Sequence, residues 1–334
     1  MNSYRGKDMI VKEKFNFFHV FLLLNIILMS GILACSRTAI RNTPMRGTTD
    51  LQGHRGARGH RPENTIPAFK YCMDQNMTTI ELDTNVTKDR DLIIYHDSKI
   101  NSSLCLDDTG KPARPVPVRE LTVAELKKLD CGSVKNPKFP QQVPVKNTRL
   151  STLSEFFTFV EKYRVQKGIK NPPDFNIELK FDEIYTDPEI KEGASLMVRE
   201  IEKAGMVKRS TVQCFVIDFL PEIKKLNSNI ATSALFQPTY LQGFLMMLGL
   251  NANRKAILEK TLAAGADIIS PYYLYVTPRF VQECHSKNIR VIPWTVNDEK
   301  TMRKMLDCGV DGIISDYPDL LFRVNSEWEK TSRR

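Results

Sequence analysis

Short runs of β-type residues follow one another along the chain beyond residue 50, and helical patterns separate most of them. The runs cover 51–54, 79–86, 92–96, 174–180, 210–216, 229–235, 266–270, 289–294 and 311–315. The helical patterns include 65–75, 194–203, 254–264, 278–287 and 299–308. Strand and helix in alternation predict a parallel sheet, because each parallel crossover leaves room for a helix.

One connection is too short for such a crossover. Only Lys88-Asp89-Arg90-Asp91 separates the second run from the third, whereas a parallel connection needs about a dozen residues or more. These two runs therefore predict an antiparallel hairpin, and a turn centred on 89–90 places His96 opposite Asp83. Removing the return strand leaves eight strands, the number that closes a (β/α)8 barrel. We predict an α/β fold, a TIM barrel with a β-hairpin after its second strand.

The segment 97–173 is long and rich in Pro, Lys and Asn, with helical patterns near 123–129 and 152–167. We interpret it as an insertion over the catalytic face. A chain of 334 residues accommodates one barrel of about 250 residues with such an insertion. The predicted domain limits are 1–34 for a signal peptide, 35–49 for a tether, 50–325 for the barrel and 326–334 for a C-terminal tail.

The first residues are typical of an export signal. Basic residues up to Lys14 precede the apolar run 17–29, which leads to Ile32-Leu33-Ala34-Cys35. This tetrapeptide resembles a bacterial lipobox and favours lipidation of Cys35, hence a periplasmic or outer-membrane lipoprotein associated with a membrane through its lipid anchor. An ordinary signal peptide and an uncleaved anchor are the alternatives, although a spanning helix needs about 20 apolar residues.

Composition excludes some other classes of protein. With 42% hydrophobic and 26% charged residues, the chain is neither disordered throughout nor a polytopic membrane protein. The net charge is +9, yet no dense basic run with interleaved aromatics predicts a nucleic-acid partner. Six cysteines follow Cys35 without a CxxC spacing; we expect most to be buried thiols, while export permits disulfides.

Four predicted strand ends carry polar residues, at the end of the barrel where active sites form. They are His54-Arg55, Glu81 with Asp83, His96-Asp97, and Glu178 with Lys180. Alternation along a strand sends Glu81 and Asp83 to one face, and Glu178 and Lys180 to one face. Three clustered carboxylates predict a single hard divalent cation, Ca²⁺ or Mg²⁺, and such an ion suits phosphoryl chemistry.

The remaining polar residues at these strand ends suit phosphoryl chemistry. Arg55 and Lys180 could neutralise the charge of a phosphate. His54 and His96 could act as a general acid and base, because an imidazole takes up and releases protons near neutrality.

The chain resembles the glycerophosphodiester phosphodiesterase family at these residues. The matching stretches are Gly53-His54-Arg55-Gly56, Arg61-Pro62-Glu63-Asn64-Thr65, Glu81-Leu82-Asp83, Tyr95-His96-Asp97, Ile177-Glu178-Leu179-Lys180, Trp294-Thr295-Val296-Asn297 and Gly309-Val310-Asp311-Gly312-Ile313-Ile314-Ser315-Asp316. The resemblance implies metal ligation by Glu81, Asp83 and Glu178, acid–base roles for His54 and His96, and phosphate contacts from Arg55 and Lys180. It also implies a small glycerophosphodiester substrate, cleaved to sn-glycerol 3-phosphate and an alcohol.

Other residues receive supporting roles. The family's Gln-Ser-Phe-Asp stretch is replaced by Gln213-Cys214-Phe215-Val216, so only Phe215 is retained as a pocket wall, together with Trp294. We expect Asn64 to cap the helix that follows it. Asp97 and Asp316 are expected to support other residues or to form turns rather than to bind the metal, and His285 is expected on the surface.

Three other functions compete with this interpretation. A phospholipase D-like enzyme acting on lysophospholipids or sphingomyelin uses similar histidines and carboxylates, although the Pro-Glu-Asn-Thr and Trp-Thr-Val-Asn stretches favour the glycerophosphodiesterases. A non-catalytic surface lipoprotein would not need His54 and His96 intact. A metal-independent phosphatidylinositol lyase would leave the three carboxylates without a purpose.

Overall fold

The structure is a computed structural model that describes residues 44–45, 47–182, 185–250 and 253–332. These residues belong to one compact unit, Arg41–Arg334. The predicted signal peptide, Cys35 and most of the predicted tether lie outside the described residues. Within the described part, no helix is both long enough and apolar enough to cross a membrane.

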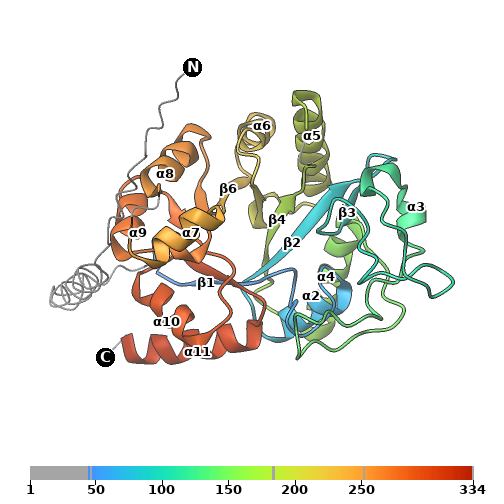
Figure 1. The fold of residues 1–334 in the computed structure, drawn as a ribbon, viewed down its shortest axis with the longest axis horizontal. Coiled ribbons are helices and arrows are strands. Elements are labelled where there is room, and N and C mark those ends of the chain that lie inside the picture. Colours follow the sequence, from blue (N-terminus) through green and yellow to red (C-terminus); the bar gives the residue numbers. More distant parts are fainter. Residues whose placement is uncertain (1–43, 46, 183–184, 251–252, 333–334) are drawn as a thin grey trace, which may run out of the picture. The chain divides into compact units, whose positions relative to one another are not determined.

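Eight parallel strands form a barrel (Figure 1). They are β1 (Asp50–Gly53), β2 (Thr79–Val86), β4 (Asp174–Leu179), β5 (Ser210–Cys214), β6 (Ala231–Phe236), β7 (Ile268–Pro271), β8 (Arg290–Val291) and β9 (Gly312–Ser315), in the spatial order β8-β7-β6-β5-β4-β2-β1-β9. Backbone hydrogen bonds from Asp311 N to Val291 O (2.8 Å) and from Ile314 N to Pro293 O (3.0 Å) join the two outer strands. The predicted TIM barrel is confirmed.

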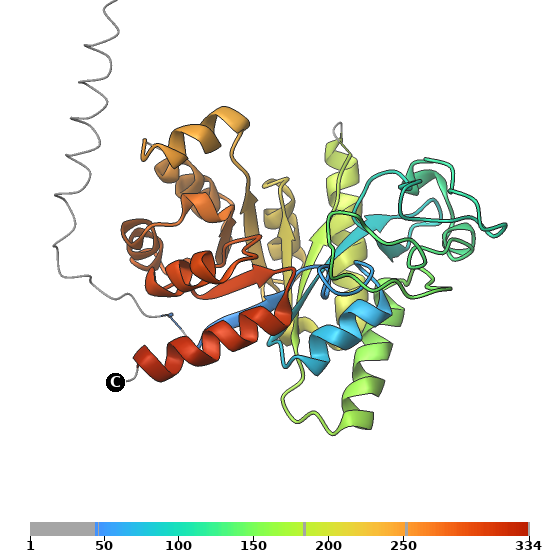
Figure 2. The same cartoon turned by 60° about the horizontal axis from the view of Figure 1, so that its bottom comes forward.

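Helices follow most of the strands and pack around the barrel (Figure 2). They are α2 (Ile66–Asp74), α4 (Leu153–Lys167), α5 (Asp187–Lys203), α6 (Phe219–Leu226), α7 (Tyr240–Met247), α8 (Arg254–Ala263), α9 (Pro278–His285), α10 (Glu299–Asp307) and α11 (Pro318–Ser332). Helix α11 runs through the predicted limit between barrel and tail at 325–326 and ends at Ser332.

The hairpin forms as predicted, but its register differs by one residue. Strand β3 (Leu92–Ile94) pairs antiparallel with β2, and Tyr95 N donates to Asp83 O at 3.0 Å, so Tyr95 rather than His96 lies opposite Asp83. The reason is a three-residue loop, closed by Thr87 N donating to Asp91 O, in which Arg90 is left-handed (φ 59°). Three-residue hairpin loops often have a left-handed residue at their end.

The predicted insertion over 97–173 consists of two different parts. Helix α4 is one of the barrel's outer helices: a Thr152–Glu155 capping box begins it, and its Phe156 packs on Phe69 and Phe175. Residues up to Leu150 form a separate small core, in which Leu126 and Leu150 pack beside Tyr95. The insertion therefore ends near residue 150, because α4 is the helix of the crossover that joins β2 to its parallel neighbour β4.

A disulfide between Cys105 and Cys131 crosses the insertion, and Cys72, Cys214, Cys284 and Cys308 are buried thiols, as expected for most of the cysteines. We expect the paired Cys105→Ser and Cys131→Ser substitutions to destabilise the insertion by about 3 kcal/mol, the usual effect of losing a link of this loop length. Hydrogen exchange of insertion amides measures this loss. Equal protection in the variant and in the oxidised parent would contradict it.

Candidate active site

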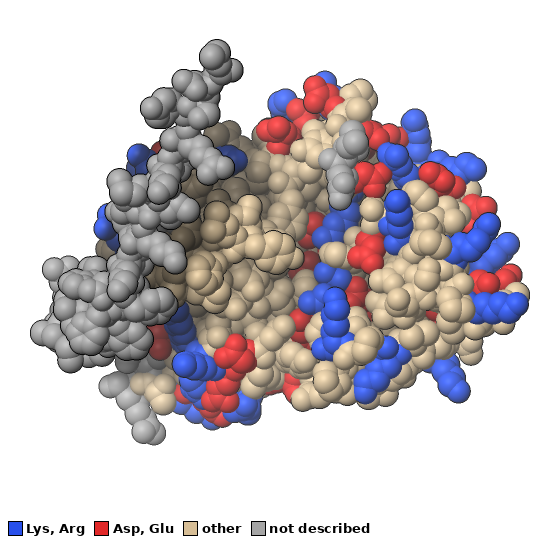
Figure 3. Space-filling view, in the orientation of Figure 1, with Lys and Arg blue, Asp and Glu red and all other residues tan. Residues whose placement is uncertain are grey.

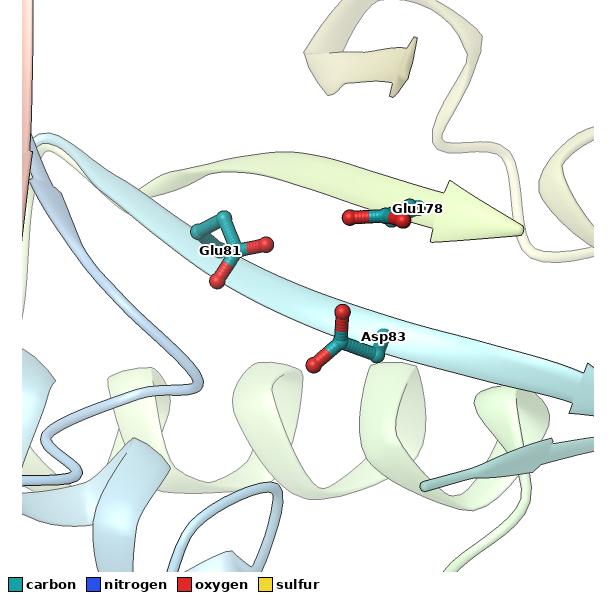
Figure 4. Close-up of side chains that lie close together, drawn as sticks. All are labelled: Glu81, Asp83 and Glu178. Atoms are coloured by element: carbon teal, nitrogen blue, oxygen red, sulfur yellow. The ribbon is translucent and has the colours of Figure 1, made fainter. Parts of the chain in front are cut away.

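Three carboxylates gather on two neighbouring strands, with Glu178 near the carboxyl end of β4 (Figure 4). Glu81 and Asp83 lie on β2 with one residue between them, and the register pairs Asp83 with Glu178 of β4. All three side chains are buried, and one oxygen from each lies within 4.8 Å of the others. Strand alternation and the parallel register thus bring together the residues that the sequence predicted.

Neighbouring side chains fix the orientation of these carboxylates. Glu81 accepts hydrogen bonds from Arg55 N (2.7 Å) and Gln213 Nε2 (2.8 Å). Asp83 accepts one from Asn64 Nδ2 (2.8 Å). The expectation that Asn64 caps α2 was wrong: Thr65 occupies the N-cap position, and Asn64 lies buried against Asp83 with φ 57°.

Below the carboxylates, polar side chains fill part of the barrel where branched apolar residues usually pack. Asn176 Nδ2 donates to Gln52 Oε1 (2.8 Å) and to Gln213 Oε1 (3.0 Å), and Gln213 in turn donates to Glu81. A hydrogen-bonded chain therefore runs from β1 through β4 and β5 to the acidic cluster. Buried polar groups that are bonded in this way stabilise one arrangement of the site.

The charges around the acidic cluster are only partly balanced. Lys180 Nζ lies 2.6 Å from Glu178 Oε1 and 3.0 Å from Asp83 Oδ1. Burial works to raise the pKa of Asp83, but Lys180, His96 and Arg55 hold it well below its usual range. Burial and the neighbouring Asp83 instead raise the pKa of Glu81. Burial also raises the pKa of Glu178, against the opposing charge of Lys180.

This imbalance fits a bound cation. Two buried carboxylates whose charged forms are disfavoured, beside a third that stays ionised, are stabilised together when a divalent ion supplies the missing positive charge. Three carboxylate oxygens are a donor set of the kind that Ca²⁺ and Mg²⁺ select. Glu81, Asp83 and Glu178 are therefore the described residues that could hold a metal.

His54 follows β1 and is held by a buried aspartate. Its Nδ1 lies 2.7 Å from Asp316 Oδ1, and Arg58 and Asn297 bind the same carboxylate. Burial, reinforced by Arg58, lowers the pKa of His54 to about 4. His54 Nε2 lies 4.0 Å from Glu81 Oε2. The imidazole is thus neutral at pH 7, with its Nε2 directed toward the acidic cluster.

His96 follows the return strand and has a carboxylate partner of its own. Its Nδ1 lies 2.6 Å from Asp97 Oδ1, and its side chain is 31% exposed, against 10% for His54. Burial acts to raise the pKa of Asp83, and His96 is close enough to the acidic cluster to help Lys180 lower it. The site thus has one enclosed and one open histidine, each oriented through Nδ1 by an aspartate.

The two predicted phosphate-binding residues flank the cluster. Arg55 Nη1 lies 2.6 Å from Glu63 Oε1, and Arg55 Nε lies 3.3 Å from Asp83 Oδ2. Lys180, described above, binds the carboxylates from the side of β4. Both cations are held by acidic partners, so they lie in fixed positions when an anion enters.

Aromatic side chains form a rim beside these residues. The rings of Phe215 and Trp294 meet edge to face at 5.5 Å, and Lys180 Nζ lies 5.9 Å from the Phe215 ring. Trp294 Nε1 donates to Ser270 O at 2.8 Å, which fixes the indole. Phe215 and Trp294 therefore lie where pocket walls were predicted. On the other side, His96 and residues of the insertion line a small pocket.

The contact between His54 and Asp316 leads to a prediction. We expect Asp316→Asn to lower kcat by about 10²–10⁴-fold with little change in KM, because the imidazole loses the group that fixes its tautomer. The pH profile of kcat should also change, which simple loss of packing would not cause. An unaltered kcat and profile would show that His54 needs no orienting partner.

Fold and site together define a class of protein. The chain is a TIM-barrel enzyme whose buried carboxylates and aspartate-bound histidines share one mouth of the barrel. It belongs to the glycerophosphoryl diester phosphodiesterase family, whose model matches residues 54–320. The prediction that it is an enzyme of this family is confirmed.

Individual relatives agree with this assignment. The glycerophosphodiester phosphodiesterase of Caldanaerobacter subterraneus is 30% identical over 81% of this chain and 95% of its own length. A Silicibacter pomeroyi structure assigned to the same enzyme class is 26% identical, with a TM-score of 0.75 over 87% of this chain and 97% of its own. An Oleispira antarctica phosphodiesterase in complex with the product sn-glycerol-3-phosphate shares the fold, at 20% identity and a TM-score of 0.63 over 83% of this chain and 96% of its own.

Proposed function

We propose that the protein hydrolyses glycerophosphodiesters to sn-glycerol 3-phosphate and an alcohol. One observation carries the proposal: the buried cluster of Glu81, Asp83 and Glu178 lies beside two histidines, each bound through Nδ1 to an aspartate. Family membership supports the same reaction. So does the product found in the Oleispira antarctica enzyme.

The proposed roles follow from the positions of the side chains. Arg55 and Lys180 hold the phosphate oxygens, because both cations border the cluster. His54 and His96 exchange protons with the attacking and leaving oxygens through Nε2, since Nδ1 of each ring faces an aspartate. Phe215 and Trp294 border the space left for the carbon skeleton of the substrate.

Glu81, Asp83 and Glu178 are the proposed ligands of one Ca²⁺ or Mg²⁺ ion. When bound, the ion would polarise a phosphoryl oxygen. The protein's own part is to hold the three carboxylates in place through Gln213, Asn64 and Lys180.

A comparison of head groups tests the proposal. Purified protein with Ca²⁺ or Mg²⁺ should release sn-glycerol 3-phosphate from glycerophosphocholine, and a chelator should stop the release. Hydrolysis of lysophosphatidylcholine but not of glycerophosphocholine would instead identify a phospholipase D-like enzyme. No hydrolysis of any glycerophosphodiester would favour a surface lipoprotein without catalysis.

We also propose that the protein is an exported bacterial lipoprotein. The lipobox-like Ile32-Leu33-Ala34-Cys35 supports this, and the Cys105–Cys131 disulfide suits an oxidising compartment. In cells fed labelled palmitate, the parent chain should carry the label and a Cys35→Ser variant should not. Label in neither chain would leave the ordinary signal peptide or the uncleaved anchor as the better explanation.

A further inference from the structure

Helix α7 and the residues after it expose large apolar side chains. These side chains are Tyr240, Leu241, Phe244, Met247, Leu248 and Leu250, and we call them the α7 surface. They are six of the 14 large hydrophobic residues exposed in the described part of the chain. A concentration of this kind marks an interaction site, because exposed apolar residues are otherwise scattered singly.

The α7 surface lies at the same end of the barrel as the active site. Helix α7 follows the carboxyl end of β6 and packs against the short helix η3 (Tyr273–Tyr275), which follows β7. Next to η3, the rings of Tyr272 and Trp294 meet at 5.7 Å, and Trp294 contacts Phe215. Aromatic contacts therefore connect η3, against which α7 packs, with the rim of the site.

The stretch that carries the α7 surface has no charged side chains. The sequence contains no Asp, Glu, Lys or Arg between Lys225 and Arg254. Figure 3 shows an uncharged area over α7, beside the groove in which charged side chains gather. An exposed apolar surface without charges fits burial among the acyl chains at the surface of a bilayer.

We propose that the α7 surface docks the barrel onto a phospholipid bilayer, with its catalytic mouth toward the head groups. The N-terminal sequence supports a bilayer over other occupants. The apolar run 17–29 and Cys35 can each attach the chain to a membrane, and residues 36–49 separate them from β1. Met45 N donates to Asp311 Oδ1 just before β9, so the segment that can extend is 36–43. Fully extended, it reaches on the order of 30 Å, comparable with the diameter of a small domain, which lets α7 reach the bilayer.

Depth-dependent fluorescence quenching tests the orientation. The full chain carrying Phe244→Trp would be reconstituted in phosphatidylcholine–phosphatidylglycerol vesicles with bromine on the acyl chains. Quenching should exceed that of the parent chain, which already contains Trp294 and Trp328. The matched control is Val165→Trp, at an exposed apolar position on α4, where no additional quenching is expected.

Three outcomes would overturn the docking proposal. Equal quenching at positions 244 and 165 would mean that the anchor holds the barrel in no fixed orientation. If the tryptophan added by Phe244→Trp already emits at blue-shifted wavelengths without vesicles, another part of the chain covers the surface. A dimer that Phe244→Asp dissociates, in the absence of quenching, would mean that a second copy covers it.

A functional measurement separates docking from catalysis. This part rests on the proposed function. Phe244→Asp combined with Leu248→Asp should lower hydrolysis of a glycerophosphodiester lipid in vesicles by on the order of tenfold or more, because two apolar side chains lose their burial. Hydrolysis of water-soluble glycerophosphocholine should stay unchanged. If the parent chain does not cleave the soluble substrate, the proposed function fails, whereas quenching at position 244 still decides the docking.

Discussion

Replacing His54 or His96 with alanine is expected to lower kcat by roughly 10²–10⁴-fold, the contribution of a positioned general acid or base. Each variant keeps Glu81, Asp83 and Glu178, so its affinity for the metal should stay close to that of the parent. The fold should tolerate both replacements, because burial lowers the pKa of His54 to about 4 and the side chain of His96 is 31% exposed. Turnover of glycerophosphocholine and metal titration by calorimetry measure the two effects.

The chain contains a matched control for this experiment. His285 Nε2 lies 2.7 Å from Asp311 Oδ2, a histidine–aspartate pair at the opposite end of the barrel, because Asp311 precedes β9. The side chain is largely buried rather than on the surface as the sequence suggested. His285→Ala should leave kcat nearly unchanged. A large loss there, or parental rates in the His54 and His96 variants, would contradict the proposed acid–base roles.

The fold could be predicted because its constraints are local. The four residues between the second and third strands exclude a parallel crossover, so the hairpin follows from chain length alone. The register of the hairpin does not follow from chain length, because it depends on whether the loop has two residues or three. The left-handed conformation of Arg90 gives a loop of three. The extent of the insertion was misjudged for a similar reason: the pattern of α4 reveals a helix but not which core it packs on.

The carboxylate cluster could also be predicted from the sequence. Alternation on β2 and β4 fixes the faces of Glu81, Asp83 and Glu178, and neighbouring parallel strands bring these faces together. The contacts that hold these carboxylates and the histidines in place could not be predicted. Asp316 binds His54 from 262 residues away, and Gln213 binds Glu81 from 132 residues away. Nothing in the spacing of such residues reveals a partner, because barrel closure alone brings them together.

Asn64 shows how a local rule can give the wrong role. An asparagine directly before a helix is a favoured N-cap, and the sequence offers no reason to prefer Thr65. In the folded chain, however, Asn64 adopts φ 57° and its amide bonds Asp83 twice, through Nδ2 and through Oδ1. Leaving a buried carboxylate without partners costs more free energy than leaving a helix uncapped by this residue. Asn64 therefore bonds Asp83 instead of capping α2.

Glu81→Gln is expected to lower the affinity for the divalent ion by at least about 100-fold, because residues that merely support metal ligands already cost 10–100-fold when replaced. Glutamine keeps the shape of the side chain and removes one charge. Without metal, the variant should be no less stable than the parent, since like-charged neighbours and burial disfavour the ionised Glu81. A buried carboxylate elsewhere provides the control: Glu200→Gln on α5 should bind the ion like the parent.

Thermal unfolding with and without Ca²⁺ or Mg²⁺ therefore separates ligation from structural support, independently of turnover. An ion at 100 times its Kd stabilises the folded parent by about 2.7 kcal/mol. Glu200→Gln should show the same increase in Tm, and Glu81→Gln should show almost none at that concentration. If Glu81 were structural only, its replacement would lower Tm without metal and leave the metal-induced increase intact. That result would remove the acidic cluster from the proposed mechanism.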